Sequence, residues 1–174
     1  MVRKIYLLIG IILLTSCDTK LRHLEMSKTP YLGDELRIDG YYYSNSALNG
    51  TGYIGVAVFY RDGFCIHTWA KIPVNHDTLN HIENDFLLND AYLNKIKSAP
   101  GHIGVFQVMY PNITMEVWES KSWIFTHYGN IVNDTTFIIN ERRSNSSGNI
   151  IQEGLTYRFV QFSPKPDSTN IYVK

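Results

Sequence analysis

The sequence predicts a mainly β domain of about eight strands, with one helical segment inserted after the third strand. Short alternating or continuous apolar runs recur along the chain, and clusters of Gly, Pro, Asn, Asp and Ser separate them. Only the segment after Pro73 spaces its apolar residues as a helix does. Because short turns join consecutive runs, the strands must pair antiparallel; a parallel sheet would need a helix after nearly every strand.

Each predicted strand ends at a turn or loop. The strands span Glu35–Tyr43, Tyr53–Tyr60, Phe64–Ala70, His102–Met109, Ile113–Glu119, Trp123–Val132, Thr135–Arg143 and Leu155–Phe162. The first alternates, with Leu36, Ile38 and Tyr42 on one face. Arg61-Asp62-Gly63, between the second and third strands, is the strongest hairpin signal, because glycine tolerates the positive φ of such turns.

The helical segment begins near Asp77, a residue suited to cap a helix. Leu79 and Ile82 follow it at helical spacing. Asn89-Asp90 is a candidate break that would divide the segment into two helices. We therefore expect one helical excursion, of one or two helices, between the third and fourth strands.

Eight antiparallel strands are the number that closes a small barrel around side chains or one small ligand. The meander over Glu35–Phe162 resembles the calycins, the group that includes the lipocalins. The resemblance implies an up-and-down barrel. A strongly bent open sheet, with the helical segment packed over one face, is the alternative.

The first 17 residues have the layout of a signal peptide. Arg3 and Lys4 precede the apolar run Ile5–Leu14, whose ten residues are too few for a spanning helix of roughly 20. Leu14-Thr15-Ser16-Cys17 resembles the lipobox of bacterial lipoproteins. That resemblance implies cleavage before Cys17 and lipidation of its thiol and amino group. An ordinary secretory peptide and an uncleaved anchor are the alternatives.

The chain is therefore expected to have three parts: a signal peptide (1–16), a lipidated tether (17–29) and a single β-rich domain (30–174). Tyr157–Asn170 is similar to the tail of small uncharacterised bacterial lipoproteins. We expect the protein in the cell envelope, held to a membrane by its lipid. The outer membrane, on its periplasmic or surface face, is favoured over the inner membrane.

The charge balance and the cysteine content limit which partners and which disulfide bonds we expect. Removing residues 1–16 of 174 leaves 158 residues, in which 14 basic residues stand against 16 acidic ones, a formal net charge of −2. This balance gives no reason to expect nucleic acid. Lipidation of Cys17 would leave Cys65 without a disulfide partner, and its apolar neighbours predict a buried residue.

No motif of a reaction or a metal site is found. The sequence has no H-E-x-x-H, paired cysteine spacing, Asp-rich calcium loop or G-x-S-x-G. His67 and His127 lie in predicted strands, and Glu116 and Glu119, three apart on one strand, should point to opposite faces. We expect no metal, no cofactor and no enzyme, with a hydrolase of unrecognised type as the weakest alternative.

The high aromatic content suggests binding. Tyr41 and Tyr43 fall on the polar side of their strand and are the candidate binding residues. We therefore expect a membrane-anchored, non-catalytic binding or interaction module, with a protein partner in the envelope. The alternative is a lipocalin-like carrier that holds a small apolar ligand inside the barrel.

Overall fold

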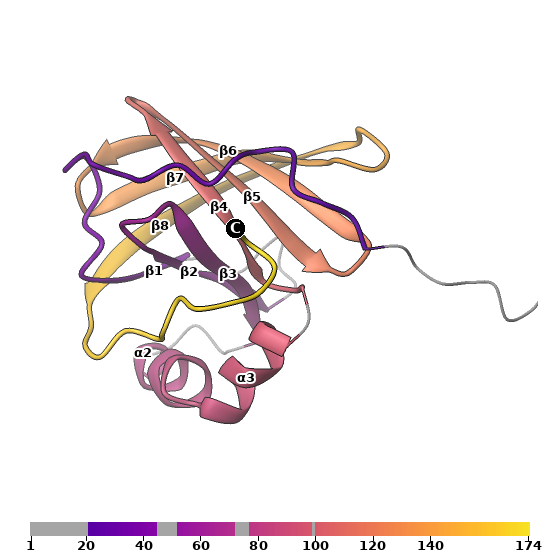
Figure 1. Cartoon of the computed structure of the whole chain (residues 1–174). Helices are drawn as coiled ribbons and strands as arrows, with labels where there is room; N and C mark the ends of the chain where they lie inside the picture. The colour runs from indigo at the N-terminus through magenta and orange to yellow at the C-terminus, as the bar shows by residue number, and fades with distance from the viewer. Residues whose placement is uncertain (1–20, 45–51, 72–76, 99) are drawn as a thin grey trace, which may run out of the picture.

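A computed structural model describes residues 21–44, 52–71, 77–98 and 100–174. Eight antiparallel strands pair in chain order, and β1 pairs with β8, so that the sheet closes into a barrel (Figure 1). The strands are β1 (Gly40–Ser44), β2 (Tyr53–Phe59), β3 (Phe64–Lys71), β4 (Ile103–Met109), β5 (Asn112–Ser120), β6 (Trp123–Asn133), β7 (Thr136–Ser144) and β8 (Ile150–Gln161). The predicted fold class is confirmed, with the sheet closed rather than open.

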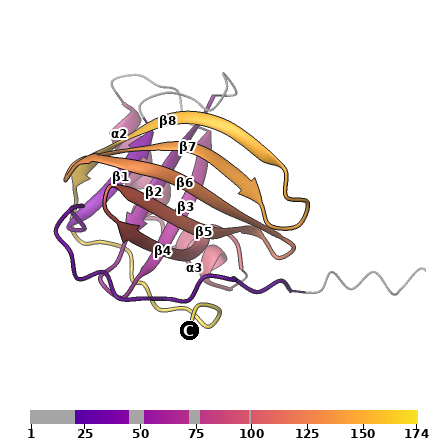
Figure 2. The same ribbon diagram turned by 90° about the horizontal axis from the view of Figure 1, so that it is seen from above.

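The helical excursion lies between β3 and β4, as predicted. It comprises α2 (Thr78–Ile82), a π-helical turn η2 (Glu83–Leu87) and α3 (Asp90–Ser98), with the break at Asn89. These elements cover the outer face of one barrel wall (Figures 1 and 2). Their buried residues form one apolar cluster with the outward side chains of β2, β3 and β4. The members include Ile82, Leu87, Leu93, Ile96, Ile54, Val56, Ile66 and Val105.

The barrel has two distinct ends. We call the end formed by the β2–β3, β4–β5 and β6–β7 turns the plugged end, because the segment 31–38 lies across it. The Tyr31 amide donates to the Arg61 carbonyl at 3.0 Å, and the Arg37 amide donates to the Asp134 carbonyl at 2.9 Å. Tyr31 and Leu36 are buried against the interior. We call the opposite end, with the β5–β6 turn and the β7–β8 loop, the polar end.

The plug explains where the first strand differs from the prediction. The sequence alternates from Glu35, yet β1 begins at Gly40. Leu36 is buried because it enters the plugged end, so the apolar pattern is the same as that of a strand. The last strand starts earlier than predicted, at Ile150, where that residue pairs with Arg143 of β7.

Residues 21–29, predicted to be a tether, lie along the outside of the barrel. The Met26 amide donates to the Glu116 carboxylate at 2.6 Å, and the Trp118 indole N–H donates to the Arg22 carbonyl at 2.9 Å. Leu24 and Met26 pack on the outer apolar cluster. This part of the expected tether is therefore bound to β5 and does not hang free.

Aromatic rings fill the interior at the plugged end. Their centroids lie 4.6 to 5.8 Å apart, the spacing of favourable aromatic pairs. The rings are those of Tyr42, Phe59, Phe106, Phe137 and Tyr157, all with almost no exposed surface. In the ranges that the structure describes, no helix is long and apolar enough to cross a membrane.

Candidate functional site

Polar side chains gather inside the barrel at the polar end. They come from five strands: β3, β5, β6, β7 and β8. The cluster consists of His67, Trp69, Glu119, His127, Arg142, Glu153 and Tyr157. These residues form the candidate site, because buried polar groups on an apolar background need a reason to be there.

Strand alternation brings the first members inward. Cys65 belongs to the interior core, and therefore His67 and Trp69, two and four residues later on β3, face the same way. Glu119 follows inward-facing Val117 on β5 by the same rule. On β6, the His127 ring meets the His67 ring at a centroid distance of 4.8 Å.

A β-bulge brings Arg142 into the site. Gly129 of β6 is opposite Ile139, and Tyr128 is opposite Glu141, so that Asn140 is an extra residue on β7. Since Ile139 faces the interior, regular alternation would point Arg142 outward. The bulge reverses the phase and sets Arg142 directly opposite His127. Bulges are known to redirect side chains in this way beside functional sites.

The neighbouring strand β8 is irregular at the same level. Ile139 pairs with Leu155, but Glu141 pairs with Gln152, so β8 also carries an extra residue there. Gly154 has a φ of +66°, a conformation that L side chains rarely adopt. This distortion lies next to Glu153, whose side chain has no exposed surface.

The charges in the cluster do not balance. Arg142 Nη1 donates to Glu119 Oε1 at 2.7 Å, and Arg142 Nε lies 2.8 Å from Glu153 Oε1 in an ion pair that lacks hydrogen-bond alignment. The Trp69 indole N–H also donates to Glu119, at 3.2 Å. Two carboxylates therefore share one guanidinium, and the formal charge of the cluster with neutral histidines is −1.

Several buried atoms have no hydrogen-bond partner among the described residues. In the cluster they are both ring nitrogens of His127, both carboxylate oxygens of Glu153, Nδ1 of His67 and Nε of Arg142, and outside it Nδ1 of His102. Glu153 Oε2 and His127 Nδ1 are 3.9 Å apart, beyond hydrogen-bond distance. An unpaired buried polar group costs about 1–3 kcal/mol, and more when charged.

Tyr157 joins the polar cluster to the aromatic core. Its hydroxyl is 2.9 Å from His67 Nε2, and its ring stacks on Phe137 at 4.8 Å. Burial, followed by the nearby His127, holds the pKa of His67 well below its ordinary value. Burial likewise raises the pKa of the Tyr157 hydroxyl well above its usual range. Both groups are therefore neutral at pH 7.

The residues singled out from the sequence lie elsewhere. Tyr41 has no exposed surface, because α2 and η2 cover its face of the sheet; its hydroxyl donates to Glu83 at 3.2 Å. Burial raises the pKa of Tyr41. Tyr43 is half-buried against the same outer cluster. The expected exposure of this face is therefore wrong. Cys17 lies outside the described residues.

Other sequence expectations are met in part. Glu116 and Glu119 do point to opposite faces, but neither is a solvent-facing charge. Glu116 is fully buried outside the barrel, where it accepts hydrogen bonds from the Met26 amide and from Asn145 Nδ2, both at 2.6 Å. Cys65 is buried as predicted, and burial raises the pKa of its thiol.

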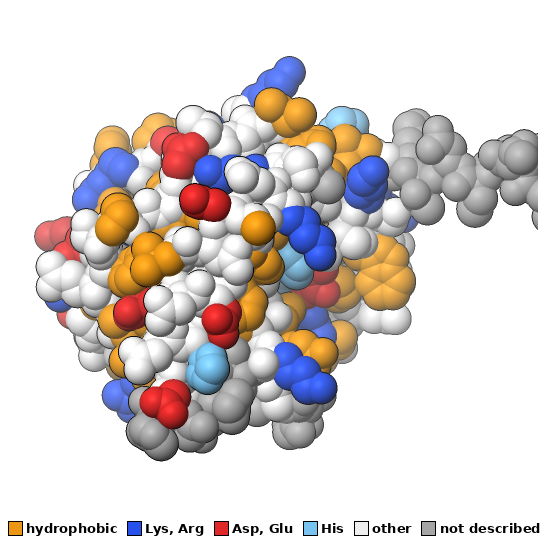
Figure 3. Space-filling model, turned by 90° about the horizontal axis from the view of Figure 1, so that it is seen from below, with side chains coloured by type: hydrophobic (Ala, Val, Ile, Leu, Met, Phe, Trp, Pro, Cys, Tyr) orange, Lys and Arg blue, Asp and Glu red, His pale blue; other side chains and the backbone are white. Residues whose placement is uncertain are grey.

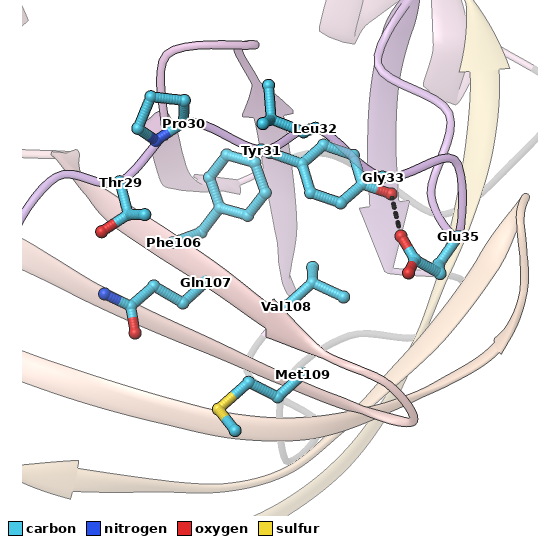
Figure 4. Close-up of a pocket in the computed structure, with 10 residues that line it drawn as sticks. All are labelled: Thr29, Pro30, Tyr31, Leu32, Gly33, Glu35, Phe106, Gln107, Val108 and Met109. Carbon is cyan, nitrogen blue, oxygen red and sulfur yellow. Dashed lines mark hydrogen bonds between the residues drawn. The ribbon is translucent and has the colours of Figure 1, made fainter.

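A cavity of about 280 Å³ lies at the plugged end, between the segment 29–35 and β4 (Figure 4). Tyr31 packs against Phe106 at a centroid distance of 5.6 Å, and its hydroxyl donates to Glu35 at 3.0 Å. Leu32 and Met109 at its rim are largely exposed. The Tyr31 hydroxyl and the Glu35 carboxylate are thus paired with each other, and none of the described residues that line this cavity has a buried side-chain polar atom without a hydrogen bond.

The cluster was not foreseen from the sequence. Alternation from Cys65 and from Val117 could have placed His67 and Glu119 on the buried faces of their strands. In the residues with described positions, no group of three or more His, Cys, Asp and Glu could hold a metal ion. No family model, curated protein or solved structure matches the chain.

Proposed function

We propose that this protein is a non-catalytic binding module of the cell envelope, anchored through lipid on Cys17, which binds a small polar molecule at the polar end of its barrel. The barrel supplies a rigid frame of closed strands, and the cluster of unpaired polar groups supplies the contacts. Carriage of a small molecule by an eight-stranded barrel accords with the size of such an interior.

The observation that carries this proposal is that the buried side chains of Glu153 and His127 lack hydrogen-bond partners. Both side chains are completely buried, and none of their four polar atoms has a hydrogen-bond partner in the described part of the chain. Burial of a charge without full compensation costs several kcal/mol. A bound molecule that supplies the missing partners would recover that cost as affinity.

The chemistry of the cluster defines the ligand. Glu153 needs hydrogen-bond donors, and each of the two ring nitrogens of His127 needs a partner of its own. The surplus negative charge favours a ligand with a positive group, such as an ammonium, over an anion. Arg142 and Glu119 retain 15% and 21% exposure of their side chains, so these two members of the cluster reach the protein surface at the polar end.

The filled aromatic half argues against the alternative of an apolar cargo. The rings of Phe59, Phe106 and Phe137 occupy the interior where a lipocalin-like carrier would hold its ligand. Tyr31 and Leu36 close the same half from outside. A molecule that enters the barrel therefore meets polar rather than apolar walls.

Native mass spectrometry of the full chain, extracted from its own membranes in mild detergent, tests the proposal. We expect a bound small molecule in the wild-type protein and its loss in Glu153→Gln. Glu83→Gln is the matched control, because it makes the same change outside the barrel, where the carboxylate contacts Tyr41. A wild-type protein without bound molecule, or equal retention in Glu153→Gln, would contradict the proposal.

A further inference from the structure

The described chain begins beside the polar end of the barrel. The Arg22 amide donates to the Lys121 carbonyl in the β5–β6 turn at 3.3 Å, and the Arg22 carbonyl accepts from the Trp118 indole at 2.9 Å. Figures 1 and 2 agree that the chain leaves the barrel next to the tip of β5 and β6. Any anchor that precedes residue 21 is therefore attached at this end.

An exposed aromatic and basic surface surrounds that point. Trp123, the first residue of β6, is 61% exposed, and Lys121 and Arg22 beside it are exposed. Ile150, at the start of β8, is also exposed at this end. In Figure 3, hydrophobic and basic side chains lie close to the place where the undescribed chain leaves. Trp with Lys or Arg is the combination enriched where proteins meet the head-group region of a bilayer.

The length of the connecting chain limits how far the polar end can lie from a membrane that holds a lipid on Cys17. Arg22 is five positions after Cys17, and five fully extended residue spacings cover at most about 17 Å. The nine residues of β5 cover about 30 Å between the two ends of the barrel. A lipid on Cys17 could not let the barrel stand upright on its plugged end while Arg22 stays bound to Lys121, because Arg22 would then be about 30 Å from the bilayer.

We propose that the polar end of the barrel rests on the lipid surface through Trp123, Lys121 and Arg22. The inference builds on the anchor in the proposed function and adds the orientation of the domain. The indole of Trp123 enters the head-group layer, and the two cations face lipid phosphates. Glu119 lies one residue before the end of β5, at the β5–β6 turn, and the candidate ligand site therefore faces the membrane.

Tryptophan quenching by brominated lipids tests the orientation. The full lipidated chain is reconstituted on vesicles of phosphatidylethanolamine and phosphatidylglycerol in which part of the lipid is brominated. Trp69 and Trp118, the other two tryptophans, stay in place in every variant. Three chains are compared with the wild type: Trp123→Phe alone, Trp123→Phe with Tyr128→Trp on the β6 wall, and Trp123→Phe with Tyr110→Trp at the plugged end. Tyr128 and Tyr110 are exposed aromatic positions in the native chain.

We expect brominated lipid to quench the Trp123 emission, and Trp123→Phe to remove most of the quenching. Tyr110→Trp should restore none of it, and Tyr128→Trp less than the native Trp123 gives. Stronger quenching at position 110 or 128 than at position 123 would overturn the orientation while leaving the anchor intact. Failure of the chain to float with the vesicles would overturn the anchor, and the orientation with it.

Discussion

The two halves of the barrel interior differ in whether their buried polar atoms have hydrogen-bond partners, although the same strands build both halves. At the plugged end, aromatic rings pack closely, and the Tyr42 hydroxyl lies within hydrogen-bond distance of the carbonyls of Arg37 and Asp134, either of which accepts its proton. At the polar end, the ring nitrogens of His127 and the oxygens of Glu153 have no such partners among the residues described. The difference indicates that the aromatic half supplies stability, whereas the polar half retains an electrostatic cost that the proposed ligand site would explain.

Tyr157 marks the boundary between the halves. One face of its ring stacks on Phe137, and its hydroxyl meets His67. A substitution on one side of Tyr157 should change stability, while a substitution on the other should change binding. Variants from both sides therefore test whether the halves are separable.

The largest expected effect is that of Phe137→Ala in the aromatic half. Phe137 is fully buried and contacts Tyr42, Phe59 and Tyr157. Loss of its ring should lower the free energy of unfolding by about 3–5 kcal/mol. Denaturant unfolding of the full chain measures it. A loss below about 1 kcal/mol would mean that the aromatic half does not carry the stability.

Arg142→Met should cause the next largest loss in the free energy of unfolding. It removes the one cation that contacts both Glu119 and Glu153 among the residues that the structure describes, and leaves these two carboxylates unneutralised in the interior. Breaking a buried pair costs about 3–5 kcal/mol, and partial exposure of Arg142 puts the loss near the lower value.

Adding Glu153→Gln to the Arg142→Met chain removes one of the orphaned charges and should recover part of that loss. Urea titrations of the single and double variants give the comparison. A double variant as unstable as Arg142→Met alone would show that the charge on Glu153 is not the source of the cost.

The stability of the folded protein should depend on pH through His67. Burial lowers its pKa, so the folded protein keeps His67 neutral while the unfolded chain takes up a proton below about pH 6.5. The unfolded state then binds more protons, and stability falls as the pH drops, by up to about 1.4 kcal/mol per pH unit from this group.

Unfolding of the wild type and His67→Gln between pH 7 and pH 5 isolates this contribution. As the pH falls, the free energy of unfolding should decrease more for the wild type than for His67→Gln. A constant difference across that interval would place a proton on His67 in the folded state and contradict its buried, neutral form.

The smallest effect on stability should be that of Glu153→Gln alone. Arg142 keeps its partner Glu119 in this variant, while a buried carboxylate without hydrogen bonds is removed. We expect the free energy of unfolding to stay within about 1 kcal/mol of the wild type, or to rise. Thermal unfolding measures it, and a loss comparable to that of Phe137→Ala would erase the distinction between the two halves.

Apolar patterns and turn residues were sufficient to predict all eight strands and the helical excursion. The pattern around Leu36 predicted a start of the first strand that is too early. A segment that buries one apolar residue between polar neighbours has the same alternating sequence pattern as a strand. Tyr41 was assigned to an exposed face from its neighbours Arg37 and Asp39. Only tertiary packing, with Glu83 and its helical turn lying over the sheet, reverses that assignment.

The candidate site was harder to predict, for a physical reason. His67, His127 and Glu119 lie on buried faces that regular alternation can identify. Arg142 does not, because its inward orientation depends on the extra residue Asn140. Bulges leave no reliable trace in a single sequence, and the charges that meet at the site lie 11 to 34 residues apart.

The ring nitrogens of His127 test the central claim most directly. The full chain, labelled with ¹⁵N-histidine, is extracted from its membranes and measured by NMR before and after its bound molecules are removed by unfolding and refolding in detergent. We expect the His127 ring resonances to shift on removal, because a ligand at Glu153 and His127 is then lost, while the exposed ring of His81 keeps its resonances. Unchanged His127 resonances would contradict the account of the polar end as a ligand site.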